Sequence, residues 1–186
     1  TSATYRQSAL TSPEKLVKDP SNKLLSRGPR FRMDAEVIRD YALRVSGLLV
    51  EAVGGASVKP YQPDGIWEAV SMPESNTLHY KQDQGEALYR RSLYSFWKRF
   101  APPPSLETFD AQARETVCIR RARTNTPLQA LVSMNDPQFF EAARKLAERT
   151  LKAATDDSAR LDFLGRTLLS RALSTAETAR LQQSLD

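Results

Sequence analysis

The chain has 186 residues, which is enough for one domain whose core needs no disulfides, and its one cysteine excludes an internal disulfide. The formal net charge of +5 comes mainly from residues 1–50. A basic surface there would suit an anionic partner. The same excess of positive charge would result if the arginines lay over the core or formed ion pairs with acids from elsewhere. The longest apolar stretch, residues 46–50, excludes a membrane span of about 20 residues, and the start of the chain does not resemble a signal peptide, so we expect a fragment or a processed product.

Residues 1–33 show no sustained hydrophobic period and contain several prolines, which predicts an irregular arm packed on the domain. A helix is expected over 34–49, because Asp34 is a good N-cap and apolar residues follow at helical spacing. Gly54 and Gly55 are expected to end that helix. Prolines then predict a long connecting region over 56–80, with one or two helical turns at 65–70.

Residues 86–100 are expected to form an amphipathic helix, because aromatic and leucine side chains recur there at helical spacing. Four side chains are predicted to lie in the core: Tyr89, Leu93, Trp97 and Phe140. Residues 116–121 are the best strand candidate, because Val117 and Ile119 alternate with polar residues. Cys118, in the same segment, is expected to be a small core residue.

Two helix starts follow in close succession. The first start is a capping box made by Thr126 and Gln129, with Pro127 at the first helical position. The second start has an N-cap at Asp136 and a proline at the first helical position, Pro137. Helices are therefore expected at about 127–134, 137–154 and 157–172. Ser174 and Glu177 predict the cap of a last helix.

These elements predict a mainly α protein, an irregular helical domain with long proline-containing loops and at most a short strand or two. We expect one domain over 1–186, or a fragment of a larger one. Its parts would be the irregular arm (1–33), a motif-rich core (34–154) and C-terminal helices (155–186).

Candidate chemistry is sparse. His79, the one histidine, would lie one turn from Asp83 if the segment were helical, which would orient a general base, but an ordinary loop histidine is the competing interpretation. Asp110 is a further carboxylate candidate for such a site. One histidine and one cysteine exclude the usual zinc sites and covalent haem attachment, so we expect no cofactor and no metal in this chain.

Clusters of arginine near aromatic residues suggest an anion site, because guanidinium groups bind carboxylate, sulfate or phosphate in bidentate fashion. The candidate residues are Arg27, Arg30, Arg32, Arg90, Arg91, Arg120, Arg121 and Arg123. Structural ion pairs with nearby acids are the competing interpretation. A nucleic-acid partner is not expected, because neither a strong basic stripe nor a known motif is present.

Several long motifs occur in a fixed order and carry a resemblance to one family. They are 27–40 (RGPRFRMDAEVIRD), 57–63 (SVKPYQP) with 65–67 (GIW), 88–94 (LYRRSLY) with 96–99 (FWKR), and 121–137. Together they resemble a planctomycete domain of unknown function, the DUF1553 type, found toward the C-terminus of large exported bacterial proteins. The resemblance is weakest after about Leu151. Gln112 stands where the family favours proline.

That resemblance implies export to the periplasm or cell surface, and upstream domains of the same polypeptide as partners, often including a cytochrome c-type domain. It supplies no catalytic residues. The leading hypothesis is a non-catalytic binding or scaffold module that binds an acidic polysaccharide. The alternative is part of an enzyme domain that acts on carbohydrate or is coupled to the redox domain, with a site completed by residues elsewhere.

Overall fold

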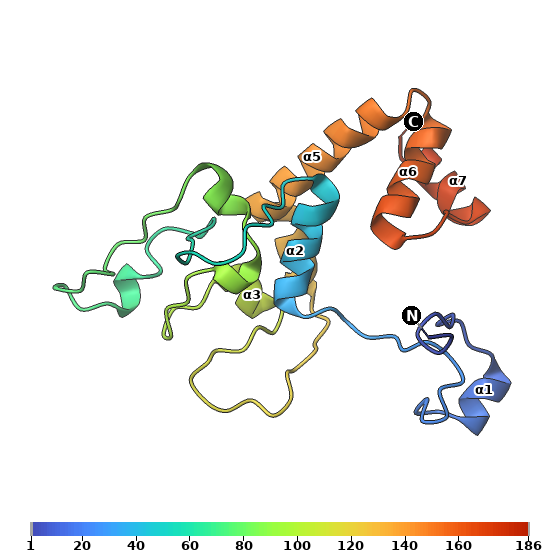
Figure 1. Cartoon of the computed structure of the whole chain (residues 1–186), viewed down its shortest axis with the longest axis horizontal. Helices are drawn as coiled ribbons and strands as arrows, with labels where there is room; N and C mark the ends of the chain where they lie inside the picture. The colour runs from blue at the N-terminus through green and yellow to red at the C-terminus, as the bar shows by residue number, and fades with distance from the viewer. Residues whose placement is uncertain (1, 186) are drawn as a thin grey trace. The chain divides into compact units, whose positions relative to one another are not determined.

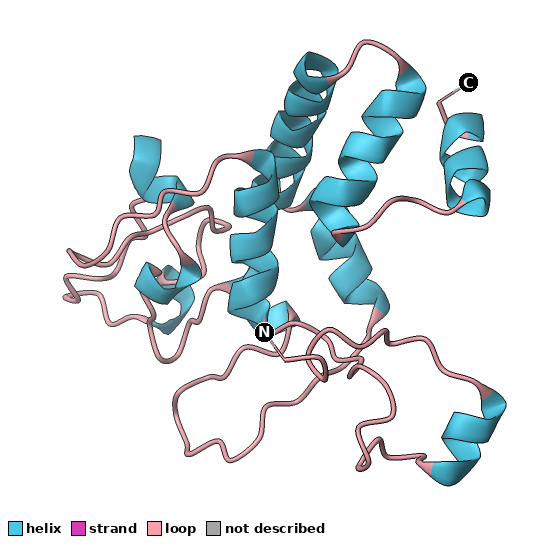
Figure 2. Ribbon diagram, turned by 45° about the vertical axis from the view of Figure 1, so that its right-hand side comes forward, coloured by secondary structure: helices cyan, strands magenta, loops and turns pink. Residues whose placement is uncertain are grey.

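The computed structural model describes residues 2–185, and the chain divides into two compact units, residues 1–33 and 34–186. Helices joined by long loops make up the second unit, and the first unit is mostly loop (Figure 1 and Figure 2). Within residues 2–185, strand pairing is limited to isolated bridges, so the chain is mainly α, as the sequence predicts. No helix in this described range has the length and apolar character needed to cross a bilayer.

The first unit is an irregular segment with one short helix, α1 (Pro13–Lys18). The Asp19 carboxylate is buried and accepts hydrogen bonds from the backbone N–H groups of Lys23 and Leu24, at 2.7 and 3.0 Å. Arg27 closes the same turn, because its guanidinium donates to the carbonyl of Asp19 at 2.8 Å. Side-chain hydrogen bonds therefore replace regular structure in holding this turn together.

Gly28 marks a close backbone approach within the first unit. Its N–H donates to the carbonyl of Ser8 at 2.9 Å, and a Cβ built at Gly28 would lie 2.4 Å from the carbonyl oxygen of Gln7. Only glycine fits this position without moving the facing backbone.

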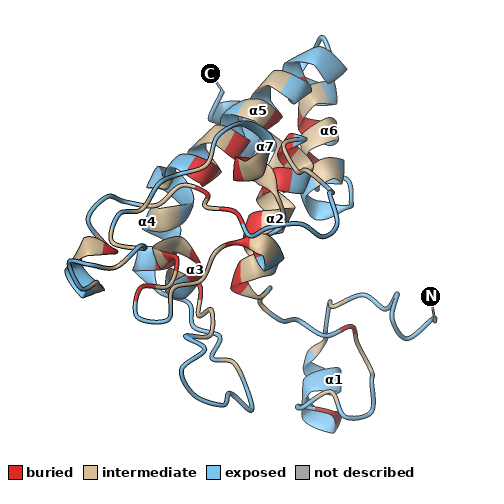
Figure 3. Ribbon diagram, turned by 60° about the vertical axis from the view of Figure 1, so that its left-hand side comes forward, coloured by how far each residue is buried: buried red, intermediate tan, exposed pale blue. Residues whose placement is uncertain are grey.

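The second unit is a set of packed helices. Its α-helices are α2 (Ala35–Ser46), α3 (Pro104–Thr108), α4 (Pro127–Asn135), α5 (Pro137–Ala153), α6 (Asp157–Leu169) and α7 (Thr175–Gln183). Three short 3-10 helices lie in the connection between α2 and α3: η1 (Glu68–Val70), η2 (Gly85–Tyr89) and η3 (Ser92–Tyr94). The most extensive helix contact joins α2 to α5, and buried residues gather on the facing sides of these helices (Figure 3).

A small hydrophobic cluster joins α2, α3 and the start of α5. Ala35, Leu106 and Phe109 are buried at its centre, and Trp97 and Phe139 pack against them. The rings of Phe109 and Phe139 meet edge to face, with centroids 5.8 Å apart. This cluster therefore holds the first turns of α2 and α5 against α3.

Helix α2 ends earlier than the sequence predicts. Gly47, and not Gly54, is the C-cap, with a left-handed φ of 81°. The N–H groups of Leu48 and Leu49 turn back to the carbonyl of Leu43, which satisfies the end of the helix. The connecting region over 56–80 is irregular, as predicted, with η1 as its helical turn.

The predicted caps of the C-terminal helices are confirmed. The Thr126 hydroxyl accepts from the N–H of Gln129 at 3.4 Å, and the Gln129 side chain accepts from the N–H of Thr126 at 3.2 Å. The Asp136 carboxylate accepts from the N–H of Gln138 at 2.9 Å. Ser174 and Glu177 form the second capping box, at the start of α7.

We expect Thr126→Ala and Asp136→Ala each to lower the free energy of unfolding by about 1 kcal/mol, because each removes a side-chain acceptor from a helix start. Urea denaturation followed by far-UV circular dichroism measures the change. Thr155→Ala, an exposed position between α5 and α6, is the matched control and should behave as wild type. Wild-type midpoints for both cap variants would contradict the capping interpretation.

The predicted helix over 86–100 is wrong. Arg90 has an extended backbone and Arg91 a non-helical one, so these two residues separate η2 from η3, and the chain pairs with other segments instead of continuing a helix. The N–H of Val50 donates to the carbonyl of Tyr89 at 3.0 Å, and the N–H of Val58 donates to that of Tyr94 at 2.8 Å. These tertiary hydrogen bonds take the place of the helical ones.

Two of the four predicted core residues are also wrong. Leu93 is 74% exposed, because the helix that was to bury it does not form, and Phe140 is 65% exposed. Helix α5 buries the face that carries Gln138, Ala142, Leu146 and Thr150, on which Phe140 does not lie. Tyr89 is half-buried, and Trp97 packs on the hydrophobic cluster.

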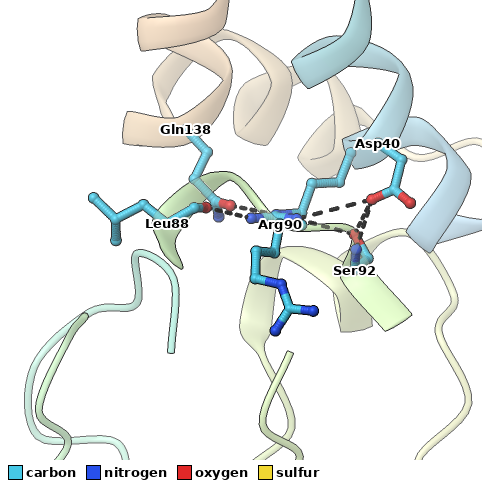
Figure 4. A network of polar contacts seen from close by, with 6 residues as sticks. Asp40, Leu88, Arg90, Ser92 and Gln138 are labelled. Carbon is cyan, nitrogen blue, oxygen red and sulfur yellow. Dashed lines mark hydrogen bonds and ion pairs between the residues drawn. The ribbon is translucent and has the colours of Figure 1, made fainter. Parts of the chain in front are cut away.

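A buried arginine binds this irregular segment to the helices. Arg39 of α2 is 2% exposed and donates to the carbonyls of Leu88 and Arg90, each at 2.8 Å, and to the Gln138 side chain of α5 at 2.5 Å. Asp40 accepts from both the N–H and the hydroxyl of Ser92 at 2.7 Å (Figure 4). Burial lowers the pKa of Arg39 to about 10, although the negative charges of Asp40 and Asp136 work to raise it. The guanidinium therefore remains charged at neutral pH.

The connection between α2 and α3 is centred on Trp67, which is 1% exposed. Its ring meets Tyr80 edge to face at 4.9 Å and lies 5.2 Å from the ring of Phe96. The ammonium group of Lys98 lies 4.9 Å from the Trp67 ring centroid, and that of Lys59 lies 5.7 Å from it. Aromatic and cation–π contacts thus give this loop-rich segment a core of its own.

Candidate functional site

A hollow of about 700 Å³ lies where the loop before α4 meets the start of α2. It is lined by Asp34, Arg120, Arg121, Ala122 and Arg123. Three of the eight arginines that the sequence suggests as anion ligands therefore come together at one concave surface. The loop projects from the helices as the yellow segment of Figure 1.

The predicted cap of α2 is absent at this hollow. Asp34 makes no side-chain hydrogen bond to the first turn of the helix, and its carboxylate instead lies 3.5 Å from the guanidinium of Arg123. The N–H groups of that turn therefore lack a capping side chain, and the partial positive charge of the helix start adds to that of the arginines.

Arg121 is held by an acid of α2. Its guanidinium makes a bidentate contact with Glu36, at 2.6 and 3.1 Å. Burial works to raise the pKa of Glu36, but the hydrogen bond and charge of Arg121, with the charge of Arg114, outweigh it and bring the pKa below its ordinary value. Glu36 is thus ionised at neutral pH and fixes Arg121 in place.

Arg120 differs from its neighbours. Its side chain is exposed, and within residues 2–185 it has neither a hydrogen-bond nor an ion-pair partner. Three arginines (Arg120, Arg121 and Arg123) and one acid (Asp34) line the hollow, and Glu36 pairs with Arg121. The site therefore retains positive charge after its internal pairs are formed, and it can accept an anionic group.

The other candidate arginines are not part of the lining of this hollow. Arg90 is structural: it donates to the carbonyls of Ala56 and Gly54 and stacks 3.9 Å from the Tyr94 ring centroid. Arg91 is exposed and lines a separate hollow beside Asp40 and Tyr41. Arg27, Arg30 and Arg32 belong to the first unit, where Arg27 binds backbone carbonyls.

The three catalytic candidates have separate partners. His79 does not pair with Asp83; its Nδ1 lies 2.9 Å from the carboxylate of Glu68. Asp83 accepts from the N–H of Lys59 at 2.7 Å. Asp110 accepts from the N–H of Thr124 at 2.7 Å and thereby closes the base of the arginine loop. The described contacts do not join these three groups into one site.

The predictions for residues 116–121 are wrong. The segment is a bent loop, with Val117 93% and Ile119 98% exposed, and Cys118 is exposed and not a core residue. A segment with alternating apolar and polar residues forms a strand only if a second strand pairs with it. No such strand pairs with this segment in the described structure. The expected burial of the thiol rested on how often cysteine is buried, and at this exposed loop that frequency does not apply.

Sequence reasoning missed the acidic partners of the arginine loop. Asp34 is predicted only as the cap of a helix, and nothing in the spacing indicates that Arg121 reaches Glu36 from a loop far along the chain. Arg114 was missed as well; its guanidinium lies 4.5 Å from the Trp97 ring centroid. No group of three or more histidine, cysteine or acidic side chains within residues 2–185 is arranged to hold a metal ion.

Comparison with known proteins identifies a family model that matches this chain. The family model named PSD1, described as "Protein of unknown function (DUF1553)", matches residues 1–185. Neither the curated proteins nor the solved structures that were searched contain a match. Since the family model covers nearly the whole chain, the protein belongs to the DUF1553 family of unknown function.

Proposed function

We propose that this chain is a non-catalytic binding module that holds an acidic polysaccharide at the hollow lined by Arg120, Arg121 and Arg123. The observation that carries the proposal is the meeting of these arginines with the uncapped start of α2. Three arginine side chains line the same space, and within the described residues the guanidinium of Arg120 has no partner. Sulfate or carboxylate groups on a polysaccharide match such donors.

The setting of this module is also a proposal. By the family resemblance, it would serve within a multidomain protein exported to the periplasm or cell surface, beside the upstream domains of the same polypeptide and in some cases a cytochrome c-type domain. A surface that holds acidic glycan would then anchor the protein in the cell envelope. The enzyme alternative has less support, because His79, Asp83 and Asp110 each have a separate structural partner.

The test is a titration of the chain with dextran sulfate at low and high salt, with neutral dextran and duplex DNA as comparisons. We expect saturable binding to dextran sulfate, weaker at high salt because counterions screen the arginines, and none to neutral dextran. Arg120→Gln should weaken the binding about tenfold, since it removes a charge-assisted hydrogen-bond donor.

Arg99→Gln is the matched control, because Arg99 is exposed and lies outside the hollow. It should bind as wild type. Equal binding of DNA and dextran sulfate, or equal losses in the two variants, would show that net charge alone attracts the polymer and would overturn the proposed site.

A further inference from the structure

The loop that carries the arginines has an apolar tip. Val117 and Ile119 are 93% and 98% exposed, and Cys118 between them is exposed as well. Side chains of this kind are usually withdrawn from water, and two so close together at such exposure mark an interaction surface. The hollow at the base of the loop gives these two residues no role, because its lining begins at Arg120.

Contacts on both sides of the tip hold it away from the helices. On one side, the indole N–H of Trp97 donates to the carbonyl of Ala113 at 3.3 Å, and Arg114 stacks on the same ring. On the other side, Arg121 pairs with Glu36 and Thr124 bonds to Asp110. The segment between these anchors is exposed (Figure 3). The fold therefore presents Val117 and Ile119 outward.

The charges around the tip point to its partner. Arg114 precedes the tip and Arg120 follows it, and both are exposed, while Glu115 is the one acid between them. An anionic lipid surface has phosphate headgroups outside and acyl chains beneath. The apolar side chains at the end of the loop match the acyl chains, and the cations behind them match the phosphates. A polysaccharide offers no apolar phase for Val117 and Ile119.

We infer that residues 113–123 form a membrane-docking loop, which inserts Val117 and Ile119 into the interface of an anionic bilayer while Arg114 and Arg120 contact headgroup phosphates. This inference goes beyond the proposed function: it concerns a lipid surface, and it adds a contact at the tip that a soluble glycan does not use. The loop lies on the bilayer surface and does not span it.

The chain supplies its own probe, because Cys118 is its one cysteine and lies in the tip. A polarity-sensitive fluorophore attached to Cys118 is titrated with vesicles of phosphatidylcholine alone or mixed with phosphatidylglycerol. We expect a blue shift with the anionic vesicles and none with phosphatidylcholine. Cys118→Ser combined with Thr155→Cys moves the fluorophore to an exposed site outside the loop and should show no shift.

Co-sedimentation of the unlabelled chain with the same vesicles tests individual side chains. Val117→Ser/Ile119→Ser should weaken the binding at least tenfold, because both apolar side chains lose their place in the lipid. Arg120→Gln should weaken it about fivefold. Val53→Ser, at a residue 90% exposed outside the loop, is the matched control and should bind as wild type.

Binding to dextran sulfate separates this inference from the proposed function. Val117→Ser/Ile119→Ser should retain wild-type affinity for the glycan while losing the vesicles. Absence of the blue shift, equal binding to both kinds of vesicle, or wild-type vesicle binding by the double variant would each overturn the inferred docking on an anionic bilayer. The glycan site would then be judged by its own titration. Absence of vesicle binding would also be the result if the tip seats in a protein partner.

Discussion

Replacing Arg39 by methionine should lower the free energy of unfolding by about 3–5 kcal/mol, because the change breaks a buried, hydrogen-bonded charge network. The carbonyls of Leu88 and Arg90 and the side-chain oxygen of Gln138 would each lose a donor inside the protein. Methionine fills similar space, so the loss would reflect polar contacts and not a cavity. Urea denaturation followed by circular dichroism measures it.

Arg39→Lys should recover only part of the stability, since one ammonium group on a flexible chain cannot reach acceptors on three sides as a planar guanidinium does. Arg44→Met is the matched control on the same helix. The Arg44 side chain is 66% exposed and pairs with an exposed Glu51, so its loss should cost less than about 1 kcal/mol. Equal midpoints for Arg39→Met and Arg44→Met would contradict the structural role of the network.

The second large effect is expected at Trp67. Trp67→Ala should lower the free energy of unfolding by about 3–5 kcal/mol, because it removes the largest side chain from the core of the connection between α2 and α3. Tyr80, Phe96 and Lys98 would lose their common partner. The loss should appear as a lower denaturant midpoint and as weaker near-UV dichroism from the remaining aromatic side chains.

Phe100→Ala is the control for Trp67, because Phe100 is an aromatic residue of the same segment that is 73% exposed. Its stability should stay within about 0.5 kcal/mol of wild type. If Trp67→Ala unfolded at the wild-type midpoint, the connection between α2 and α3 would lack the aromatic core described here.

The sequence by itself determined the parts of this protein that depend on neighbouring residues. Three helix caps satisfy backbone N–H groups two or three residues away: Thr126 with Gln129, Asp136 alone, and Ser174 with Glu177. The helices after these caps start where the sequence predicts. The mainly α class follows from these local signals. The family could also be recognised in advance, because its motifs are read in order along the chain.

Tertiary structure alone decided the parts that depend on distant partners. The segment 86–100 has helical spacing, yet its backbone pairs with Val50 and Val58, and the periodicity of one segment does not reveal which other segment will supply its hydrogen bonds. Segment 116–121 has the alternation of a strand, but no second strand among residues 2–185 pairs with it.

The candidate site shows the same division. The sequence shows that arginines are numerous, but not that Arg120, Arg121 and Arg123 would meet the start of α2 while Arg90 turns inward to backbone carbonyls. Local caps and periodicity are short-range and can be read from the order of residues. The placement of a charge depends on which acid, carbonyl or ring the folded chain brings to it, and only the packing of distant segments determines that.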